Sequence, residues 1–520
     1  MSEKKSFKER LDRFWGISTH GSSFKVEIIA GIATFLAMSY ILVVNPNQIL
    51  YANGTGDPRW ASLFIATAFG AILGTLLMSV YAKMPLAQAP GMGLNSMLGG
   101  IIAGGAVGAS AGAYAYSIQY SLAQALFLVF ISGVLFLLLS IVPVGRHKET
   151  GRFITLREKI FDGMPECIKK AIPVGIGLFI AFIGLQNAKI ISANQYTLVE
   201  FVDLTKIFTG SLRDADGNLY NYTYAIVGLI SFLSIAILSH YKLKGAVIYG
   251  ILIATLVALP LGVANFDVLA GKTDGVSWKF WESFSSYFGS DGVFLSVFKE
   301  GIKLPSGSLV TSIMLVITFA MIDMFDTMGT VVGCATNANL LDENGKPLNY
   351  NKIMISDSVA TATGAIFGTS TVTTFVESGT GIAAGGKTGL TSFVTTILFV
   401  LSLFLLPLFA FIPSSAAAGA LIYVGVLMMS NVVNIDFKNI KNAVPAFVTI
   451  VTMVLAYSIT KGIGIGIITY VLINVFTYLV DLVKYLFNKE NNEKPKLELS
   501  VVILVVFALF LVYFFVPTEF

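Results

Sequence analysis

The chain has 520 residues and a net charge of +4, and its 34 Lys or Arg and 30 Asp or Glu residues make up only 12% of it. A typical soluble domain carries about 25% charged residues, about twice the charged fraction of this chain. Hydrophobic residues make up 55% of the chain. Too few polar side chains remain to cover a surface in water, which excludes a soluble enzyme, a nucleic-acid-binding protein and a disordered chain.

Long apolar runs dominate the chain after a charged N-terminal segment. Residues 1–25 are too charged for a cleaved signal peptide and are expected to lie in the cytoplasm. A helix needs about 20 apolar residues to cross a bilayer, and about fourteen runs approach this length, with a fifteenth at 499–516. The fourteen runs are 26–45, 60–80, 86–104, 121–144, 172–191, 223–239, 246–263, 309–332, 353–367, 369–386, 390–412, 415–432, 443–459 and 463–483. The predicted fold is an all-α polytopic protein of the cell membrane.

Positive charge sets the predicted orientation of these spans. With the N-terminus in the cytoplasm, about three quarters of the Lys and Arg residues fall in cytoplasmic loops, as the positive-inside bias requires. Arg157, between the fourth and fifth runs, is one of them. The same count places the insertion 264–308 outside the cell. The C-terminal segment 484–520 contains the fifteenth run, and the sequence leaves open whether that run crosses the membrane.

No metal site, cofactor site or nucleophilic catalytic centre is expected. Cys167 and Cys334 lie far apart and form no C-x-x-C pair. The three histidines, His20, His147 and His240, lie at or near charged segments.

Two of the runs do not resemble plain spanning helices. Residues 85–105 read PLAQAPGMGLNSMLGGIIAGG and residues 368–386 read GTSTVTTFVESGTGIAAGG. Glycine and proline destabilise helices, and irregular backbone at membrane depth is tolerated only inside protein or beside a water-filled cavity. Paired interrupted segments at matching places in two halves indicate a transporter site. A simpler alternative is that the small residues permit close helix packing.

The two interrupted segments occupy matching positions. Asn95 lies 69 residues after Val26, where the first run begins, and Glu377 lies 68 residues after Leu309, where the eighth begins. Seven spans per half would invert the second half relative to the first. The spacing therefore predicts two inverted seven-span repeats.

Acidic residues fall within predicted spans, where each charge costs several kcal/mol (about 2.5–3.5). Asp323 and Asp326 lie three residues apart on one face of the eighth span, and Thr327 and Thr330 continue the polar strip. Two carboxylates this close cannot both ionise easily in a low dielectric. The sequence shows no Lys, Arg or His nearby in the same spans.

Each acid has a structural and a functional interpretation. We interpret Asp323 and Asp357 as structural polar groups within the bundle, and Glu27 as a charge at a helix start or the membrane interface. Asp326 and Glu377 are interpreted as acceptors for N–H groups of a ligand, or as proton carriers. Carboxylates without nearby cations suit a neutral ligand rich in N–H donors.

The sequence also resembles a known family. The stretches MSYILVVNPNQIL (38–50), QAPGMGLN (88–95), FDTMGT (325–330) and TSTVTTFVESGTGIAAGGKTGLT (369–391) are similar to signature stretches of AzgA-like purine permeases. These are the adenine, guanine and hypoxanthine branch of the nucleobase–ascorbate, or nucleobase:cation symporter, superfamily. The likeness extends from about residue 14 to 485.

This resemblance implies a specific architecture. It implies fourteen spans in two inverted sevens, with short strands in spans 3 and 10 and the substrate between them. A core domain would comprise 26–144 and 309–412, and a gate domain 172–263 and 415–483. Movement of core against gate would give alternating access, and homodimers would be usual.

The resemblance also implies site residues. Glu377 resembles the glutamate that pairs with N–H groups of the base, Asp326 matches the acidic position in span 8, and Asn95 resembles a polar residue lining the site in span 3. Thr374 and Phe375 complete the expected substrate-binding set, with Phe375 stacking on the ring. Asp326 and Glu377 are the expected proton-coupling groups.

One departure from the family pattern bears on coupling. A histidine found near the span-8 acid in some uracil-type relatives is replaced here by Thr330, which argues against a histidine relay. The sequence leaves open coupling to H⁺ or Na⁺, and which purine is preferred. The expected function is uptake of purine nucleobases by a secondary transporter, with no cofactor.

Two other functions are alternatives to purine transport. An anion transporter of sulfate-permease type would need a cation near the interrupted segments, and the candidate, Lys387, lies at a span end. A membrane-embedded acid-dyad protease would need a second acid motif of YD or GxGD type, and the sequence shows none.

Overall fold

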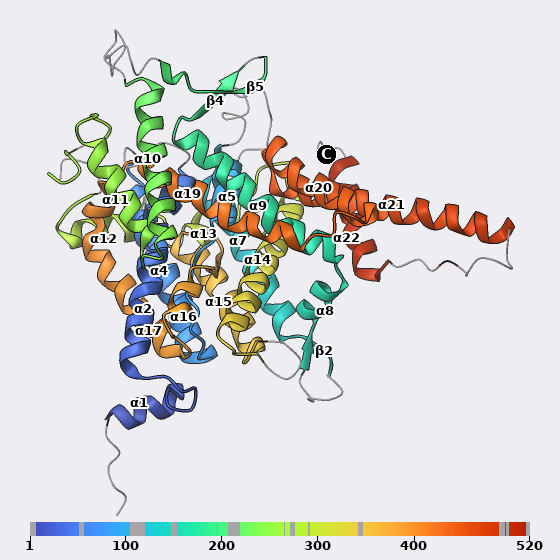
Figure 1. Ribbon diagram of the computed structural model, residues 1–520, viewed down its shortest axis with the longest axis horizontal. Helices are drawn as coiled ribbons and strands as arrows, with labels where there is room; N and C mark the ends of the chain where they lie inside the picture. Colours follow the sequence, from blue (N-terminus) through green and yellow to red (C-terminus); the bar gives the residue numbers. More distant parts are fainter. Residues whose placement is uncertain are drawn as a thin grey trace, which may run out of the picture.

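The structure is a computed structural model, and it is mostly helical (Figure 1). It describes residues 7–50, 57–103, 120–146, 153–194, 196–205, 219–264, 266–270, 276–289, 292–341, 347–487, 495 and 499–515. His147 and parts of the predicted N-terminal segment, insertion and C-terminal segment lie outside these ranges.

The elements follow the chain in this order. Those before the insertion are α1 (Phe7–Trp15), α2 (Phe24–Met38), α3 (Ile41–Ile49), α4 (Trp60–Leu77), the π-helical turn Met78–Ala82, β1 (Gln88–Pro90), α5 (Met92–Ala103), α7 (Leu122–Ile141), β2 (Pro143–Arg146), β3 (Phe153–Thr155), α8 (Leu156–Gly163), α9 (Glu166–Asn187), β4 (Ile191–Asn194), β5 (Leu198–Phe201), α10 (Asn221–His240) and α11 (Ala246–Ala258). The rest are α12 (Phe280–Phe288), α13 (Ser296–Lys299), α14 (Leu309–Asn337), α15 (Tyr350–Phe367), β6 (Val372–Thr374), α16 (Ser378–Ala383), α17 (Gly389–Ser402), the 3₁₀ turn Leu403–Leu405, α18 (Leu406–Ala410), α19 (Ser414–Met429), the 3₁₀ turn Ser430–Asn434, α20 (Ile440–Leu455), α21 (Ile459–Phe487) and α22 (Val501–Phe515).

The polytopic membrane architecture is confirmed. Within the described ranges, nine helices are long and apolar enough to cross a membrane, and four further apolar helices are shorter. Each predicted run coincides with helix or, in the two interrupted segments, with a strand followed by a helix. Apolar sequence of this length favours helices because they satisfy their own backbone hydrogen bonds in lipid.

Each of the two interrupted segments contains a short strand, as the resemblance implied, and the two strands pair with each other. β1 and β6 form a two-stranded antiparallel ladder in which Gln88 lies opposite Thr374 and Pro90 opposite Val372. The β-branched run in β6 favours the extended backbone. α5 follows β1 and the six-residue α16 follows β6. Both helices therefore begin next to the ladder, far from either end of the bundle's long helices.

The helices pack in two groups. The first helix group is α2–α5, α7 and α14–α17, where α2 packs on α17, α4 on α15 and α17, and α7 on α14 and α15. The second helix group is α9–α11 and α19–α21, where α9 packs on α19 and α20, α10 on α11 and α19, and α20 on α21. Figure 1 shows α2 beside α17, although more than 300 residues separate them in the chain.

Glu27 lies in the first turn of α2, which agrees with the helix-start alternative and not with the interfacial one. Its side chain is fully buried, and it accepts hydrogen bonds from the backbone N–H groups of Lys387 (3.0 Å) and Thr388 (3.3 Å) and from the Thr391 hydroxyl (2.5 Å). These are the free donors at the start of α17, where a carboxylate is favoured. Glu27 therefore fastens α2 to α17.

The insertion covers one end of the first helix group. α12 packs on α4 and α13 packs on α7. The buried Tyr287 donates a hydrogen bond to the carbonyl of Phe367 (2.8 Å), while Trp278 and Trp281 remain exposed. At the other end of the chain, α22 packs against α8, α14 and α21, and α21 projects from the bundle in Figure 1.

Candidate functional site

A cavity of about 440 Å³ lies between the two helix groups. We call it the central cavity. The first group contributes residues of α14 and the β1–α5 and β6–α16 segments, and the second contributes α9, α19 and the turn after α19. Its lining residues are Gly91, Met92, Gly93, Pro173, Ile176, Ile180, Phe325, Asp326, Gly329, Thr330, Gly333, Cys334, Thr373, Thr374, Phe375, Val376, Glu377, Gly379, Val424, Leu427, Met428, Ser430 and Asn431.

Glu377 lies at the start of α16, between β6 and the helix. Its Oε1 accepts a hydrogen bond of 2.6 Å from the hydroxyl of Tyr40, a buried residue of the first span. The Tyr40 oxygen is also 3.5 Å from the sulfur of Met92. A charge-assisted bond of this length orients the carboxylate, which leaves its other oxygen available to the cavity. Tyr40 was missed as a site residue; the stretch 38–50 was noted only for its family likeness.

Asp326 faces the same cavity from α14. Its Oδ2 lies 3.5 Å from the Thr373 hydroxyl of β6. Thr374 and Phe375 continue the wall from β6 towards Glu377. The structure therefore brings together four of the five predicted substrate-binding residues.

Asn95 is placed elsewhere. It is fully buried behind the ladder, outside the cavity lining. Its amide donates to the Pro90 carbonyl (3.3 Å), and its oxygen accepts from the Ser370 hydroxyl. These bonds fix the turn between β1 and α5 to the segment before β6. The predicted direct contact between Asn95 and a ligand does not agree with this position.

Three glycines leave the central cavity open. A Cβ added at Gly329, Gly333 or Gly379 would meet no other side chain or distant backbone within 4 Å among the described residues. All three line the cavity. A larger side chain at these positions would therefore occupy ligand volume without displacing protein.

Gly329→Leu is expected to reduce transport at least about tenfold while leaving the protein folded, because the side chain fills the cavity and leucine favours helix by about 1 kcal/mol over glycine. Solute uptake and thermal stability in detergent measure the two effects. Gly145→Ala, at an equally open position on β2 outside the cavity, is the control. Normal uptake by Gly329→Leu would mean that the solute does not pass along this face of α14.

Behind the cavity, Asp357 forms a buried network. It accepts bonds from Arg157 Nη2 (3.1 Å), Thr327 Oγ1 (2.7 Å) and Gln88 Nε2 (3.0 Å). Thr327 also accepts from the backbone N–H of Thr374 (3.4 Å). The network thus connects α15 to both strands and to α14, and it positions β6 beside the cavity.

Arg157 corrects the charge assignment made from sequence. It is not a loop cation: its side chain is fully buried, pairs with Asp357, and lies over the Phe136 ring at 3.7 Å. It also donates to the carbonyl of Met354 (3.2 Å). Its helix, α8, begins at Leu156 with Thr155 as the N-cap, and it folds back into the bundle. The loop-like local sequence does not reveal this long-range placement.

Asp323 lies near this network and away from the cavity lining. It is fully buried, and its Oδ2 accepts from the Thr361 hydroxyl (3.0 Å). Its Oδ1 has no partner among the described residues. Asp323 therefore joins α14 to α15, in a position distinct from that of Asp326.

Comparison with known proteins agrees with the geometry. The family model Xan_ur_permease, described as "Permease family", matches residues 25–465. The chain belongs to this permease family. The match covers β1, β6, the central cavity and both helix groups except most of α21. The protein is therefore a multi-pass membrane transporter and not an enzyme.

Relatives named as purine permeases align with most of the length of this permease. It is 36% identical to the guanine/hypoxanthine permease PbuO of Bacillus subtilis, over 86% of this chain and 91% of that one. It is 34% identical to the adenine permease AdeQ of Escherichia coli, over 90% and 91% of the two chains. The resemblance to adenine, guanine and hypoxanthine permeases is confirmed.

Solved structures share the fold of this permease at low identity. The transmembrane domain of a cyanobacterial bicarbonate transporter, BicA, has a TM-score of 0.54 and 15% identity, covering 84% of this chain and 97% of that one. SLC26A9 has a TM-score of 0.55 and 12% identity, covering 92% and 70%. These matches establish the transporter fold of the chain.

Proposed function

We propose that this permease imports purine nucleobases, namely hypoxanthine, guanine or adenine, as a secondary active transporter. The observation that carries the proposal is the pair Asp326 and Glu377 in one cavity, whose described lining residues include no Lys, Arg or His. Two acceptors without a cation suit a neutral ring with N–H donors and disfavour an anion. The names of the relatives PbuO and AdeQ point to the same solutes.

In this proposal Glu377 accepts two N–H bonds from one edge of the base. Tyr40 holds the carboxylate in place, and Asp326 accepts from or bridges to another polar edge. Thr374 and the backbone of β6 complete the polar wall, and Phe375 packs against the ring. Hydrogen bonds to a charged group contribute about 1.5–3 kcal/mol each, so two can dominate recognition of a small solute.

Alternating access is supported by the matched packing of two halves. If each half has seven spans, the equivalent helices are α4 and α15, α7 and α17, α9 and α19, α10 and α20, and α11 and α21. The packing of α10 on α19 then corresponds to that of α20 on α9, and the packing of α10 on α11 to that of α20 on α21. In the same way, the packing of α7 on α15 corresponds to that of α17 on α4. β1 pairs with its counterpart β6. We therefore assign the first helix group as a moving core and the second as a gate, with fourteen spans in two inverted repeats.

The orientation and assembly belong to the same proposal. The cation bias supports a cytoplasmic N-terminus and an extracellular insertion, and the family resemblance favours a homodimer. Because the cavity's acids face the solute, we assign Asp326 and Glu377 as the groups that couple transport to protons. Na⁺ is the competing coupling ion.

Proteoliposomes test the solute and the coupling ion together. Radiolabelled hypoxanthine is expected to accumulate when the outside is acidic, and a Na⁺ gradient alone is expected to drive none. Unlabelled guanine or adenine should block the uptake, whereas sulfate and bicarbonate should not. Competition by sulfate or bicarbonate would instead favour the anion transport named for the structural neighbour BicA.

Asp326→Asn is expected to abolish proton-driven accumulation of hypoxanthine, a loss of about 100-fold, because an amide cannot take up and release the proton. Exchange of internal for external hypoxanthine is expected to persist in part, since an amide still accepts a hydrogen bond. The exchange assay separates coupling from binding. Full acid-driven accumulation by Asp326→Asn would assign proton coupling to another group.

A further inference from the structure

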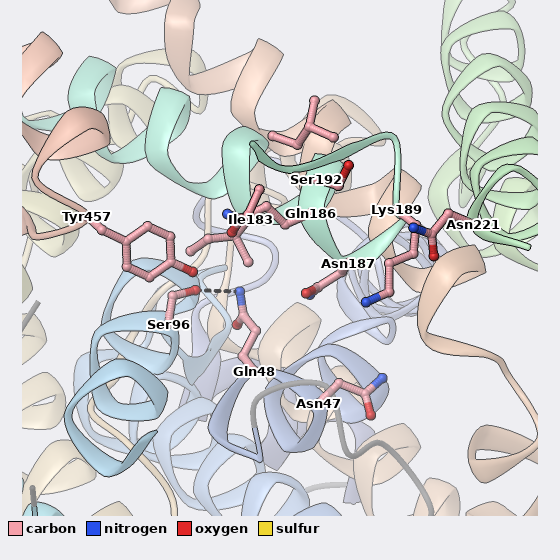
Figure 2. Close-up of a pocket in the computed structure, with 12 residues that line it drawn as sticks. Asn47, Gln48, Ser96, Ile183, Gln186, Asn187, Lys189, Ser192, Asn221 and Tyr457 are labelled. Carbon is pink, nitrogen blue, oxygen red and sulfur yellow. Dashed lines mark hydrogen bonds between the residues drawn. The ribbon is translucent and has the colours of Figure 1, made fainter. Parts of the chain in front are cut away.

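A second cavity, of about 250 Å³, lies between the two helix groups at a different level. We call it the amide pocket, because carboxamide side chains from α3, α9 and α10 surround it. Figure 2 shows Gln48 and Asn187 on two sides of the same space, with Tyr457 at one end. Its lining residues are Asn47, Gln48, Ser96, Ile183, Gln186, Asn187, Lys189, Ile191, Ser192, Ala193, Asn221 and Tyr457.

The amide pocket and the central cavity follow the same two helices. On α5, Met92 and Gly93 line the central cavity and Ser96 lines the amide pocket about one turn later. On α9, Ile180 lines the first and Ile183 the second. The two cavities are therefore successive compartments of one interface.

α5 packs closely on α9 beside both compartments. Gly93 touches α9 and α21 so closely that an added Cβ would lie 2.8 Å from Ile176 and 3.6 Å from Ile459. α9 and α19 run antiparallel, since Gly177 faces Met428 while Gly184 faces Ile422. The central cavity lies towards the C-terminal end of α19, and the amide pocket lies towards the C-terminal end of α9. Because α9 and α19 are antiparallel, the two cavities lie towards opposite ends of this helix pair.

The pocket presents unused hydrogen-bonding capacity. Gln48 is 3% exposed, and its Nε2 donates to the Ser96 hydroxyl (2.7 Å). Its Oε1 accepts no bond from any described residue. A buried acceptor left without a donor costs free energy, which a ligand N–H would recover. Asn47 is less available, because its oxygen accepts from the Trp60 indole (2.8 Å).

The chemistry of these groups indicates the ligand. A carboxamide offers a donor and an acceptor side by side, the pattern that asparagine and glutamine use to bind the edge of adenine. We propose that the amide pocket is a second binding site for the same flat, neutral, N–H-bearing bases, occupied on the way to or from the central cavity. This inference rests on the proposed function for the identity of its ligand.

Saturation binding of radiolabelled hypoxanthine to the purified full-length permease tests the proposal. The unmodified protein is expected to bind in two components, a tighter central one and a weaker one in the amide pocket. Gln48→Leu should weaken the second component about tenfold, because one hydrogen bond is lost and Ser96 loses its donor. Asn187→Leu should also weaken the second component. Because Asn187 is only half-buried, this variant is expected to fold even if Gln48→Leu does not.

The matched control is Asn434→Leu, an exposed amide outside both cavities, which should leave both components unchanged. Glu377→Gln should remove the tighter component and retain the weaker one. A single component unaffected by Gln48→Leu and Asn187→Leu would overturn the amide pocket. Displacement of the weaker component by sulfate would overturn its ligand class, because Lys189 lies exposed on its wall. Retention of both components in Glu377→Gln would contradict only the central site.

Discussion

Glu377→Gln is expected to reduce hypoxanthine uptake by more than about 100-fold while the permease remains in the membrane. The substitution removes the negative charge and turns one acceptor of the carboxylate into a donor. Two charge-assisted bonds to the base, of about 1.5–3 kcal/mol each, would be lost or weakened. The bond from Tyr40 would also change from a charge-assisted to a neutral one. Uptake into cells, normalised to the amount of membrane-inserted protein, measures the effect.

Glu166→Gln provides the matched control for this substitution. Glu166 is an acid of similar chemistry at the start of α9, but its side chain is 71% exposed, and it pairs with Lys169, whose side chain is 9% exposed. Its replacement is expected to leave uptake within about twofold, because the exposed Glu166 carboxylate lies outside the central cavity and remains hydrated when the pair with Lys169 is lost. Equal uptake by Glu377→Gln and Glu166→Gln would remove Glu377 from the site.

Arg157→Leu is expected to destabilise the permease by about 3–5 kcal/mol, because it leaves Asp357 buried without its cation. Both side chains of this pair are fully inaccessible to solvent. The network around Asp357 holds Gln88 of β1 directly and Thr374 of β6 through Thr327, so the loss should disorder the β1–β6 ladder as well. The expected result is little folded permease in the membrane and a lower Tm in detergent.

Neutralising the partner tests whether the charge is the cause. Arg157→Leu combined with Asp357→Asn is expected to recover most of the lost stability, because the amide still accepts from Thr327 and no unpaired charge remains. Arg146→Leu, an exposed cation on β2 that lies over Phe153, is the control. If Arg157→Leu folds as well as Arg146→Leu, the buried ion pair is not essential.

Much of the architecture follows from local sequence. Runs of apolar residues specify spanning helices, and a Pro/Gly-rich or Gly-rich polar interruption breaks a helix, because both depend on neighbouring residues along the chain. The short strands at these interruptions were implied by the family resemblance. The same local argument identified Asp326 and Glu377, since an acid in an apolar span is costly wherever it lies. Their positions in one cavity agree with that reasoning.

The parts missed from sequence depend on contacts between distant segments. Arg157 looks like a loop cation until α8 folds against α7 and its side chain reaches Asp357 of α15. Tyr40 meets Glu377 across 337 positions of sequence. Glu27 caps a helix that begins more than 360 residues later. Asn95 bonds to Ser370 rather than lining the cavity, and Ser370 lies 275 residues away in the segment before β6. No local pattern encodes these partners.

A structure of the permease with hypoxanthine bound tests the central claim most directly. The account predicts the base in the central cavity, with one N–H edge within about 3 Å of the Glu377 carboxylate and a second polar edge near Asp326. A base seated away from both acids, with Glu377 still bonded only to Tyr40, would contradict it.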